Sequence, residues 1–359
     1  MKIVYIAETS LTNKSAYSQH VVKMSDAFGQ LNHDLILYLP QTKENLSYED
    51  LKDKFLLVSK KKFVIRPLIN FKLTNIFLKL FFLFKVIRNI KIDKPELILT
   101  RSFLSSIVLS LFKIKHILEI HSEFQSLTKF LMINFNFINS KYIKKKILIS
   151  KSLNSIFKFK DNEFIVLHDG VDIKNFESIK IRDDIKKVCY TGSFYKGRGI
   201  ELIVRLAKNF PNLKFELYGQ TDDQLKIDLK NLKIYDYVNY CEIPNILKDS
   251  DLLLMPYAKK VFVRSKSLNT ADYCSPLKMF DYLASGKIII SSKLSGICEV
   301  LKHNENSIIV EDYEYKLWEQ EIIKIIKKEY DTEKLKNNAI KTAREYTWVK
   351  RASTIISNN

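Results

Sequence analysis

Short apolar runs alternate with longer amphipathic segments along most of the chain. The run Lys2-Ile-Val-Tyr-Ile-Ala indicates a buried strand, and residues 16–31 follow it with apolar positions at helical spacing. Because such alternation is typical of parallel sheets covered by helices, the sequence predicts the α/β class. Further strands are expected at residues 34–39, 96–100, 116–121, 147–150, 187–191, 213–218, 238–242, 251–255 and 287–292. Further helices are expected at residues 74–90, 103–112, 151–159, 200–209, 224–232, 313–328, 332–346 and 348–357, and residues 41–62 are expected to form a charged, irregular connection.

A chain of 359 residues is too long for one ordinary core, so we expect two α/β domains. The pair Asp169-Gly170 is a turn signal that closes the first domain, and the polar stretch 174–186 is the best linker candidate. Strand and helix alternate again after it. We therefore place the domains at residues 1–170 and 171–344.

The best-marked helix lies between Tyr273 and Gly286. Ser275 is expected to cap it, Pro276 fits the first helical position, and Gly286 supplies a left-handed stop. At 100° per residue one face is apolar and the other polar. The apolar face holds Leu277, Phe280, Leu283 and Ala284, and the polar face, expected to be accessible, holds Ser275, Lys278, Asp281, Tyr282 and Ser285.

Lys278 falls in the first turn of this helix, where unpaired N–H groups favour an anion. Asp281 follows it in the unfavourable order for a helical ion pair, so local stability does not explain the lysine. A phosphate bound at the helix end would explain it. A solvated lysine remains the alternative.

A glycine-rich turn, residues 192–199, joins a predicted strand to the helix at 200–209. Its glycines allow close backbone approach to a ligand, and Arg198 can bind phosphate in a bidentate manner. By contrast, the loop after the first strand lacks G-x-G-x-x-G, so no dinucleotide cofactor is expected.

His121 ends the predicted strand 116–121, at the edge where ligands bind in such sheets. A histidine there is also commonly just a hydrogen-bonded surface residue. The lysine cluster at 141–146 has a similar pair of interpretations: contact with phosphate or acidic lipid, or a solvated element end.

The formal charge is +19, and residues 1–170 hold 27 Lys and Arg against 14 Asp and Glu. Such a basic half suits nucleic acid, an anionic membrane face or an acidic substrate, although a biased composition rich in Lys, Ile, Asn and Phe explains it equally well. The sequence contains neither a helix-turn-helix nor aromatic RNP-like strands, so no nucleic-acid partner is expected.

Lysines and an arginine interrupt the apolar region 71–92, which argues against a transmembrane span. The helix at 74–90 is therefore interpreted as a packed helix, with membrane contact as the alternative. Glu8 follows the first strand directly, so that strand is not a signal peptide. The four cysteines include no C-x-x-C pair, which predicts reduced thiols and a cytoplasmic location.

The run Ser-Pro-Leu-Lys-Met-Phe-Asp-Tyr-Leu-Ala-Ser-Gly-Lys, from Ser275 onward, resembles the donor-site helix of family 4 glycosyltransferases. Glu119-x-His121, residues 168–172 (His-Asp-Gly-Val-Asp) and the turn 192–199 match the family's order and spacing. The resemblance implies the GT-B fold, with two Rossmann-like domains facing each other across a cleft and residues 345–359 packing back on the first domain.

The resemblance also implies roles for single residues. Asp281 takes the place of a glutamate that binds the nucleotide ribose, and Tyr273 replaces a second glutamate near the donor sugar. Of the two cations that hold the diphosphate, Arg198 keeps the second and Ser193 replaces the first, while Lys278 restores the charge. The implied catalytic residues are His121, Arg198 and Lys278. Implied donor-binding residues are Gly192, Ser193, Gly197, Arg198, Ser275, Leu277, Lys278 and Asp281, and Ser15, Ala16, Tyr17 and Tyr273 are further candidates for sugar or phosphate contact.

The implied reaction transfers a sugar from a nucleotide-diphosphate donor, with retention and without metal or cofactor, to a glycan or lipid-linked acceptor. The setting would be bacterial surface polysaccharide or glycolipid synthesis, in the cytoplasm or on the inner membrane face. Two alternatives stay open: a non-catalytic GT-B subunit, suggested by Ser193 and Tyr273, and a basic protein that binds nucleic acid or a membrane surface.

Overall fold

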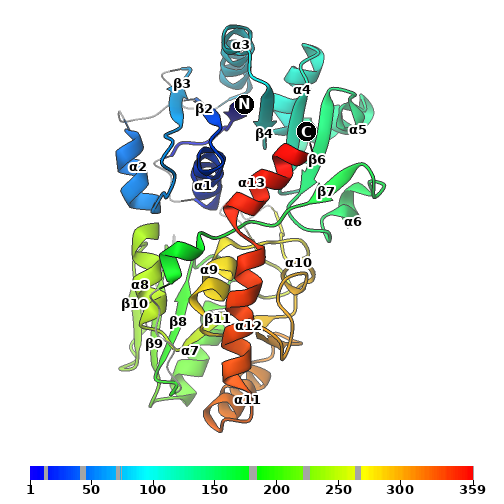
Figure 1. Ribbon diagram of the computed structural model, residues 1–359. Coiled ribbons are helices and arrows are strands. Elements are labelled where there is room, and N and C mark those ends of the chain that lie inside the picture. Colours follow the sequence, from blue (N-terminus) through cyan, green and yellow to red (C-terminus); the bar gives the residue numbers. More distant parts are fainter. Residues whose placement is uncertain are drawn as a thin grey trace. The chain divides into compact units, whose positions relative to one another are not determined.

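The computed structural model describes residues 1–11, 15–40, 46–69, 73, 75–177, 184–220, 227–262 and 268–358, without the side chains of residues 126 and 127. The chain divides into two compact units (Figure 1). Unit 1 comprises Met1–Ile149, Leu153–His168 and Trp348–Asn359, and unit 2 comprises Ser150–Ser152 and Asp169–Thr347. Each unit is a parallel sheet with helices packed on it.

Unit 1 contains a seven-stranded sheet in the order β3-β2-β1-β4-β5-β6-β7, with every neighbouring pair parallel. Strands β2 and β3 follow one another on one side of β1, and β4 to β7 follow one another on its other side, so the direction of strand addition reverses between β1 and β4. Ligands bind beyond the carboxyl ends of strands at such a reversal. The strands are β1 (Lys2–Ile6), β2 (Asp34–Leu39), β3 (Val64–Pro67), β4 (Leu97–Thr100), β5 (His116–Ile120), β6 (Ile143–Leu148) and β7 (Phe164–Val166).

Side-chain caps start four helices of unit 1. Ser15, Ser47, Asn75 and Ser102 each accept a hydrogen bond from the backbone N–H three residues later. Each such cap contributes about 1 kcal/mol. The helices are α1 (Ala16–Gln30), α2 (Tyr48–Phe55), α3 (Ile76–Asp93), α4 (Phe103–Leu111), α5 (Ser126–Asn134), α6 (Asn154–Phe157), α13 (Trp348–Ser357) and the short 3-10 helix η1 (Phe137–Asn139).

Unit 2 contains a six-stranded parallel sheet in the order β10-β9-β8-β11-β12-β13. Successive residues of its central strands enter two apolar clusters: Leu253 and Ile289 pack with α9, and Leu254 and Ile290 pack with α7 and α11. Both faces are therefore buried. The strands are β8 (Lys187–Thr191), β9 (Lys214–Tyr218), β10 (Leu232–Tyr235), β11 (Leu252–Met255), β12 (Ile288–Ser292) and β13 (Ile308–Val310).

The helices of unit 2 cover this sheet. They are α7 (Ile200–Asn209), α8 (Ile243–Lys248), α9 (Leu277–Ser285), α10 (Ser295–Cys298), α11 (Tyr315–Ile326) and α12 (Thr332–Glu345), with 3-10 helices η2 (Ile173–Phe176) and η3 (Tyr240–Glu242). Helix α9 packs against both α8 and α12. No helix within the described ranges is both long and apolar enough to cross a bilayer.

The predicted α/β class is confirmed, and β2, β8, α7 and α13 have the predicted bounds. Several local predictions were wrong. The stretch 41–62 contains α2, whose capping box pairs Ser47 with Asp50, although residues 41–45 lie outside the description. The strand predicted at 238–242 is instead η3 leading into α8, because Asn239 and Glu242 form a capping box and Pro244 suits a first helical turn.

Three further predictions need correction. The helix predicted at 224–232 is absent from residues 227–231, and β10 begins at Leu232; residues 224–226 lie outside the description. The helix predicted at 151–159 is limited to the four residues of α6. The lysine cluster at 141–146 lies largely inside β6, which begins at Ile143, so most of it is not an element end. Residues 178–183 of the expected linker are also outside the description.

Candidate functional site

The turn at residues 192–199 leaves the carboxyl end of β8, next to the chain reversal between β8 and β11. Gly192 has φ of 135°, and a Cβ there would lie 2.6 Å from Lys278 Nζ. Gly199 has φ of 81°, and its Cβ would lie 1.9 Å from the Pro256 carbonyl oxygen. At Gly199 a side chain would clash with the Pro256 backbone, and at both positions the positive φ favours glycine, so the glycines are what allow the turn to lie against Lys278 and Pro256.

Helix α9 brings Lys278 to this turn. The predicted stop at Gly286 is confirmed, with φ of 62°, but the predicted start was wrong by one residue. Pro276 is the N-cap residue in an extended conformation, the helix begins at Leu277, and no side chain caps it. Ser275 therefore does not act as the cap, because Pro276 with ψ of 132° is still outside the helix.

Two cations of unit 2, Arg198 and Lys278, converge on the Tyr257 ring. Lys278 Nζ lies 3.5 Å from the centroid of Tyr190 and 5.6 Å from that of Tyr257. The Arg198 guanidinium lies 5.2 Å from the same Tyr257 centroid. Among the described residues, Lys278 Nζ has no hydrogen-bond partner and neither cation forms an ion pair with a carboxylate. Aromatic faces compensate only part of such charge.

The surroundings of Lys278 are electrostatically unfavourable for its ammonium form. Burial, followed by the charge of Arg198, lowers the pKa of Lys278 well below its usual value. A bound anion would oppose both effects, because it supplies negative charge beside the amine. The geometry therefore favours a ligand with at least two negative charges.

Asp281 occupies a different part of α9. It is buried, and its Oδ1 accepts a hydrogen bond from Tyr240 Oη at 2.9 Å. Its neighbour Tyr282 is also buried and accepts a hydrogen bond from the Thr191 N–H at 2.8 Å, which ties α9 to the end of β8. The polar face predicted to be accessible is thus mostly covered, because α8 and α12 pack on α9.

The remaining residues predicted in unit 2 are distributed around the turn and the start of α9. The Ser193 carbonyl accepts a hydrogen bond from Tyr190 Oη at 2.8 Å, and Gly197 has a positive φ. Tyr273 is 3% exposed, and its carbonyl accepts a hydrogen bond from Ser150 Oγ. Leu277 is buried and Ser275 is half-buried.

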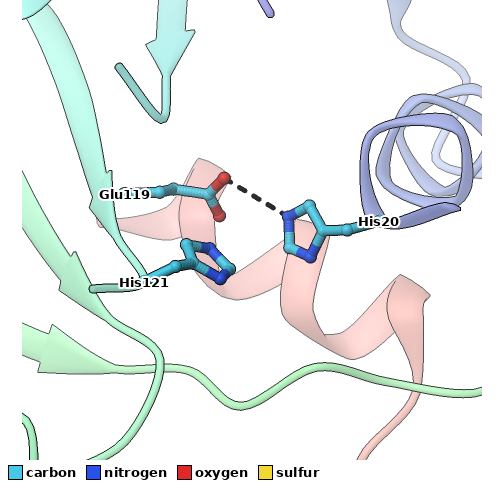
Figure 2. Close-up of side chains that lie close together, drawn as sticks. All are labelled: His20, Glu119 and His121. Atoms are coloured by element: carbon cyan, nitrogen blue, oxygen red, sulfur yellow. Dashed lines mark ion pairs between the residues drawn. The ribbon is translucent and has the colours of Figure 1, made fainter. Parts of the chain in front are cut away.

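Unit 1 holds a second cluster, at the carboxyl end of β5. His121 follows β5 directly, Glu119 lies within it, and His20 comes from α1 (Figure 2). The His20 and His121 ring centroids are 4.8 Å apart, and His20 Nε2 lies 3.4 Å from Glu119 Oε2. Arg351 of α13 donates to Glu119 Oε1 at 2.8 Å, and Tyr5 Oη donates to Oε2 at 3.0 Å.

Neighbouring charges fix the ionisation of this cluster. Burial alone would raise the pKa of Glu119, but Arg351, His20 and Arg101 outweigh it and lower that pKa to about 2. Burial, followed by the charges of Arg101, His20 and Arg351, lowers the pKa of His121 well below its usual value. Glu119 is therefore a carboxylate and His121 a neutral imidazole at neutral pH.

His20, Glu119 and His121 also have the spacing of a metal site, since one ligand atom from each lies within 4.8 Å of the others. The Glu119 carboxylate, however, already carries donors on both oxygens, and two arginines lie close to it. Their positive charge opposes a cation, so the surroundings of this donor set do not fit a metal ion.

The start of α1 lies near the same strand ends. Ser15 caps α1, Ala16 is its first residue, and Tyr17 Oη accepts a hydrogen bond from the Glu8 N–H at 3.2 Å. The Arg101 guanidinium lies 4.3 Å from the centroid of the Tyr17 ring.

Sequence reasoning missed several of these neighbours. His20 and Arg101 gave no local signal, and Arg351 joins Glu119 from 232 residues away. Tyr190 lies two residues before Gly192, and it was the one neighbour that the sequence could have indicated. An aromatic ring beside a glycine turn can face a cation, as this ring faces Lys278. Arg198 and Lys278 meet in unit 2, whereas His121 belongs to unit 1.

Comparisons with known proteins agree with this layout. The family model for glycosyl transferases group 1 matches residues 171–345, which lie within unit 2. An uncharacterized glycosyltransferase of Methanocaldococcus jannaschii is 25% identical over 335 residues, which cover 82% of this chain and 81% of that protein.

Solved structures with similar folds cover the whole chain. A glycosyltransferase from Rickettsia africae has a TM-score of 0.76 at 14% identity, covering 99% of this chain and 97% of that chain. Anabaena HepE, solved in complex with UDP and glucose, has a TM-score of 0.71 at 15% identity, covering 99% and 98%. At these identities the structures establish the fold alone. Residues 171–345 therefore form a glycosyl transferases group 1 domain, and the protein is a glycosyltransferase with the GT-B fold.

Proposed function

We propose that the protein is a retaining glycosyltransferase of family 4, which moves a sugar from a nucleotide-diphosphate donor to a glycan or lipid-linked acceptor. The observation that carries this proposal is the pair of uncompensated cations, Arg198 and Lys278, at the turn after β8 and the start of α9. A diphosphate supplies the negative charge that these side chains lack. Anabaena HepE, which has a similar fold, was solved with UDP and with UDP-glucose.

In the proposed reaction, the bond between the sugar C1 and the diphosphate oxygen breaks while the acceptor oxygen bonds to C1 on the same face. Negative charge grows on the departing diphosphate. Arg198 would bind it in a bidentate manner, Lys278 would add a point charge, and the N–H groups of Leu277 and Lys278 at the helix start would donate to it. Preorganised donors of this kind stabilise the transition state.

The acceptor proton passes to an oxygen of the leaving phosphate in this proposal. Because the phosphate takes this proton, His121 does not need to act as the base. Its proposed role is to shape the sugar pocket as a neutral imidazole. Asp281 would bind the ribose hydroxyls through its carboxylate, which also accepts from Tyr240 Oη. No metal or cofactor takes part.

We further propose that residues 1–170, with 345–359, bind the acceptor and residues 171–344 bind the donor. The acceptor would belong to surface polysaccharide or glycolipid synthesis in a bacterium. The protein would act in the cytoplasm, peripherally on the inner membrane face. No nucleic-acid partner is proposed.

The donor site is tested by calorimetry with UDP, GDP, CDP and ADP. We expect one of them to bind, and Arg198→Ala with Lys278→Ala to weaken that binding at least about a hundredfold, since each lost charge-assisted contact contributes about 1.5–3 kcal/mol. The matched control is Arg205→Ala with Lys208→Ala, which removes the same charge from exposed positions on α7. Equal weakening in both variants, or no binding by any nucleotide, contradicts the proposal.

The non-catalytic alternative is favoured by Ser193 and by the burial of Tyr273, which leaves little of that side chain exposed for a sugar. It is tested separately, by incubating the pure protein with the sugar nucleotides of the nucleotide that binds. Release of free nucleotide by the wild type, but not by the Arg198→Ala, Lys278→Ala variant, eliminates this alternative.

A further inference from the structure

Helix α3 exposes a stripe of large apolar side chains. Phe77 is 78% exposed and Phe84 is 62% exposed, and Leu80 and Phe81 between them are also exposed. Because these positions recur every three or four residues, they lie on one side of the helix. The opposite side, with Phe82, Leu83, Val86, Ile87 and Ile90, packs into the core of unit 1. The exposed stripe is therefore additional to what folding requires.

Helices α4 and α5 extend this stripe. α3 contacts α4, α4 contacts α5, and Figure 1 shows the three helices as neighbours within unit 1. Leu111 and Phe112 are exposed at the end of α4, and Phe130, Ile133 and Phe135 are exposed on and just after α5. We call these nine residues the apolar face: Phe77, Leu80, Phe81, Phe84, Leu111, Phe112, Phe130, Ile133 and Phe135. A gathering of exposed apolar side chains on neighbouring helices marks a site of interaction.

The apolar face has basic surroundings. Residues 76–145 contain twelve Lys and Arg against four Asp and Glu. Two of those acids, Asp93 and Glu119, are buried and paired with Arg66 and Arg351. Arg88 and Lys91 are exposed on α3, and Lys113 and Lys129 are exposed beside Phe112 and Phe130. The Lys85 ammonium lies 5.5 Å from the centroid of the Phe81 ring.

This combination distinguishes between occupants. A second copy of the chain would bring a like-charged face against this one, which costs free energy. An anionic bilayer instead buries the aromatic rings at the boundary between headgroups and acyl chains and attracts the flanking cations.

We propose that the apolar face of α3, α4 and α5 docks the protein on the surface of a membrane that contains anionic lipids. The proposal gives a physical surface to the membrane location included in the proposed function, and it is independent of the donor site in unit 2. The aromatic side chains enter the interface, and Arg88, Lys91, Lys113 and Lys129 contact the lipid phosphates.

Co-sedimentation of the full chain with vesicles tests this. Vesicles of phosphatidylcholine with phosphatidylglycerol should bind the protein, and pure phosphatidylcholine vesicles should bind it at least about tenfold more weakly. Phe77→Ser with Phe84→Ser should weaken binding to the mixed vesicles by about tenfold or more, because the two phenylalanine rings that would move from water into the bilayer interface are absent. Arg88→Gln with Lys91→Gln should weaken binding less than the phenylalanine substitutions do. High salt should remove the difference in binding between this charge variant and the wild type.

The matched control is Ile323→Ser with Ile326→Ser, which removes two exposed apolar side chains from α11 of unit 2. Circular dichroism and thermal unfolding confirm that each variant is folded. Loss of vesicle binding with nucleotide binding intact supports the docking surface. Three results overturn it. The first is no binding of the wild type to the mixed vesicles, and the second is equal binding by the Phe77→Ser, Phe84→Ser variant. The third is a dimer of the wild type in solution that becomes monomeric in this variant and not in the control.

Discussion

The two clusters of buried charge differ in how they are compensated. In unit 1, Glu119 accepts from Arg351 and Tyr5 and lies beside His20, so its negative charge is matched within the fold. In unit 2, Arg198 and Lys278 meet over the Tyr257 ring, and no carboxylate in the part of the chain that the structure describes is bound to either. The first cluster stabilises unit 1, whereas the second carries a charge that a ligand must match.

The largest effect should come from breaking the compensated cluster. Arg351→Met removes the partner of a fully buried carboxylate and should lower the free energy of unfolding by about 3–5 kcal/mol. Urea unfolding monitored by circular dichroism measures it. Adding Glu119→Gln should restore part of the loss, because the unpaired charge is then gone. Additive losses in the double variant would contradict the pairing.

Acid should reveal the same cluster. The pKa of Glu119 falls from 4.5 to about 2 on folding, because Arg351, His20 and Arg101 outweigh the burial that opposes its charge. The folded state therefore binds fewer protons, so this stability is present above pH 4.5 and is lost as the pH falls toward 2. Unfolding titrations between pH 6 and pH 2 should show it, and Arg351→Met should move the acid transition to higher pH.

The uncompensated cluster should couple nucleotide binding to protons. Burial and Arg198 lower the pKa of Lys278 in the free protein, and a bound diphosphate raises it again. Binding should therefore take up protons at Lys278, and affinity should increase as the pH falls toward the free pKa. Calorimetry in buffers of different ionisation enthalpy measures the uptake. The same uptake in Lys278→Met would contradict this origin.

The smallest effect concerns stability. Lys278→Met replaces an uncompensated buried amine by an apolar chain of similar size and should raise the free energy of unfolding by about 1 kcal/mol at pH 7. The depressed pKa means that the folded wild type binds fewer protons, so its stability rises with pH up to the unfolded pKa. The advantage of Lys278→Met should accordingly shrink in thermal unfolding measured at increasing pH. A destabilised variant would show that the ammonium supports the fold.

The sequence was informative wherever local chemistry decided the structure. The apolar strands β8 and β12 and the glycine that ends α9 are local signals, and the turn 192–199 with Arg198 and Lys278 followed from them. Prediction failed where a competing local motif was overlooked, as with the Asn239 and Glu242 capping box. Prediction also failed where distant elements decide which residues are buried. Helices α8 and α12 cover the polar face of α9, and the sequence of α9 itself does not indicate these contacts.

The ion pair between Glu119 and Arg351 has a consequence for biosynthesis. Strand β5 and helix α13 belong to the same unit, yet all of unit 2 beyond Asp169 lies between them in the chain. Since a ribosome makes proteins from the amino end, Glu119, His20 and Tyr5 leave the exit tunnel long before their arginine is translated. Unit 2 can complete its sheet before α13 of unit 1 has been translated. Unit 1 is therefore translated first but is the later of the two units to finish folding.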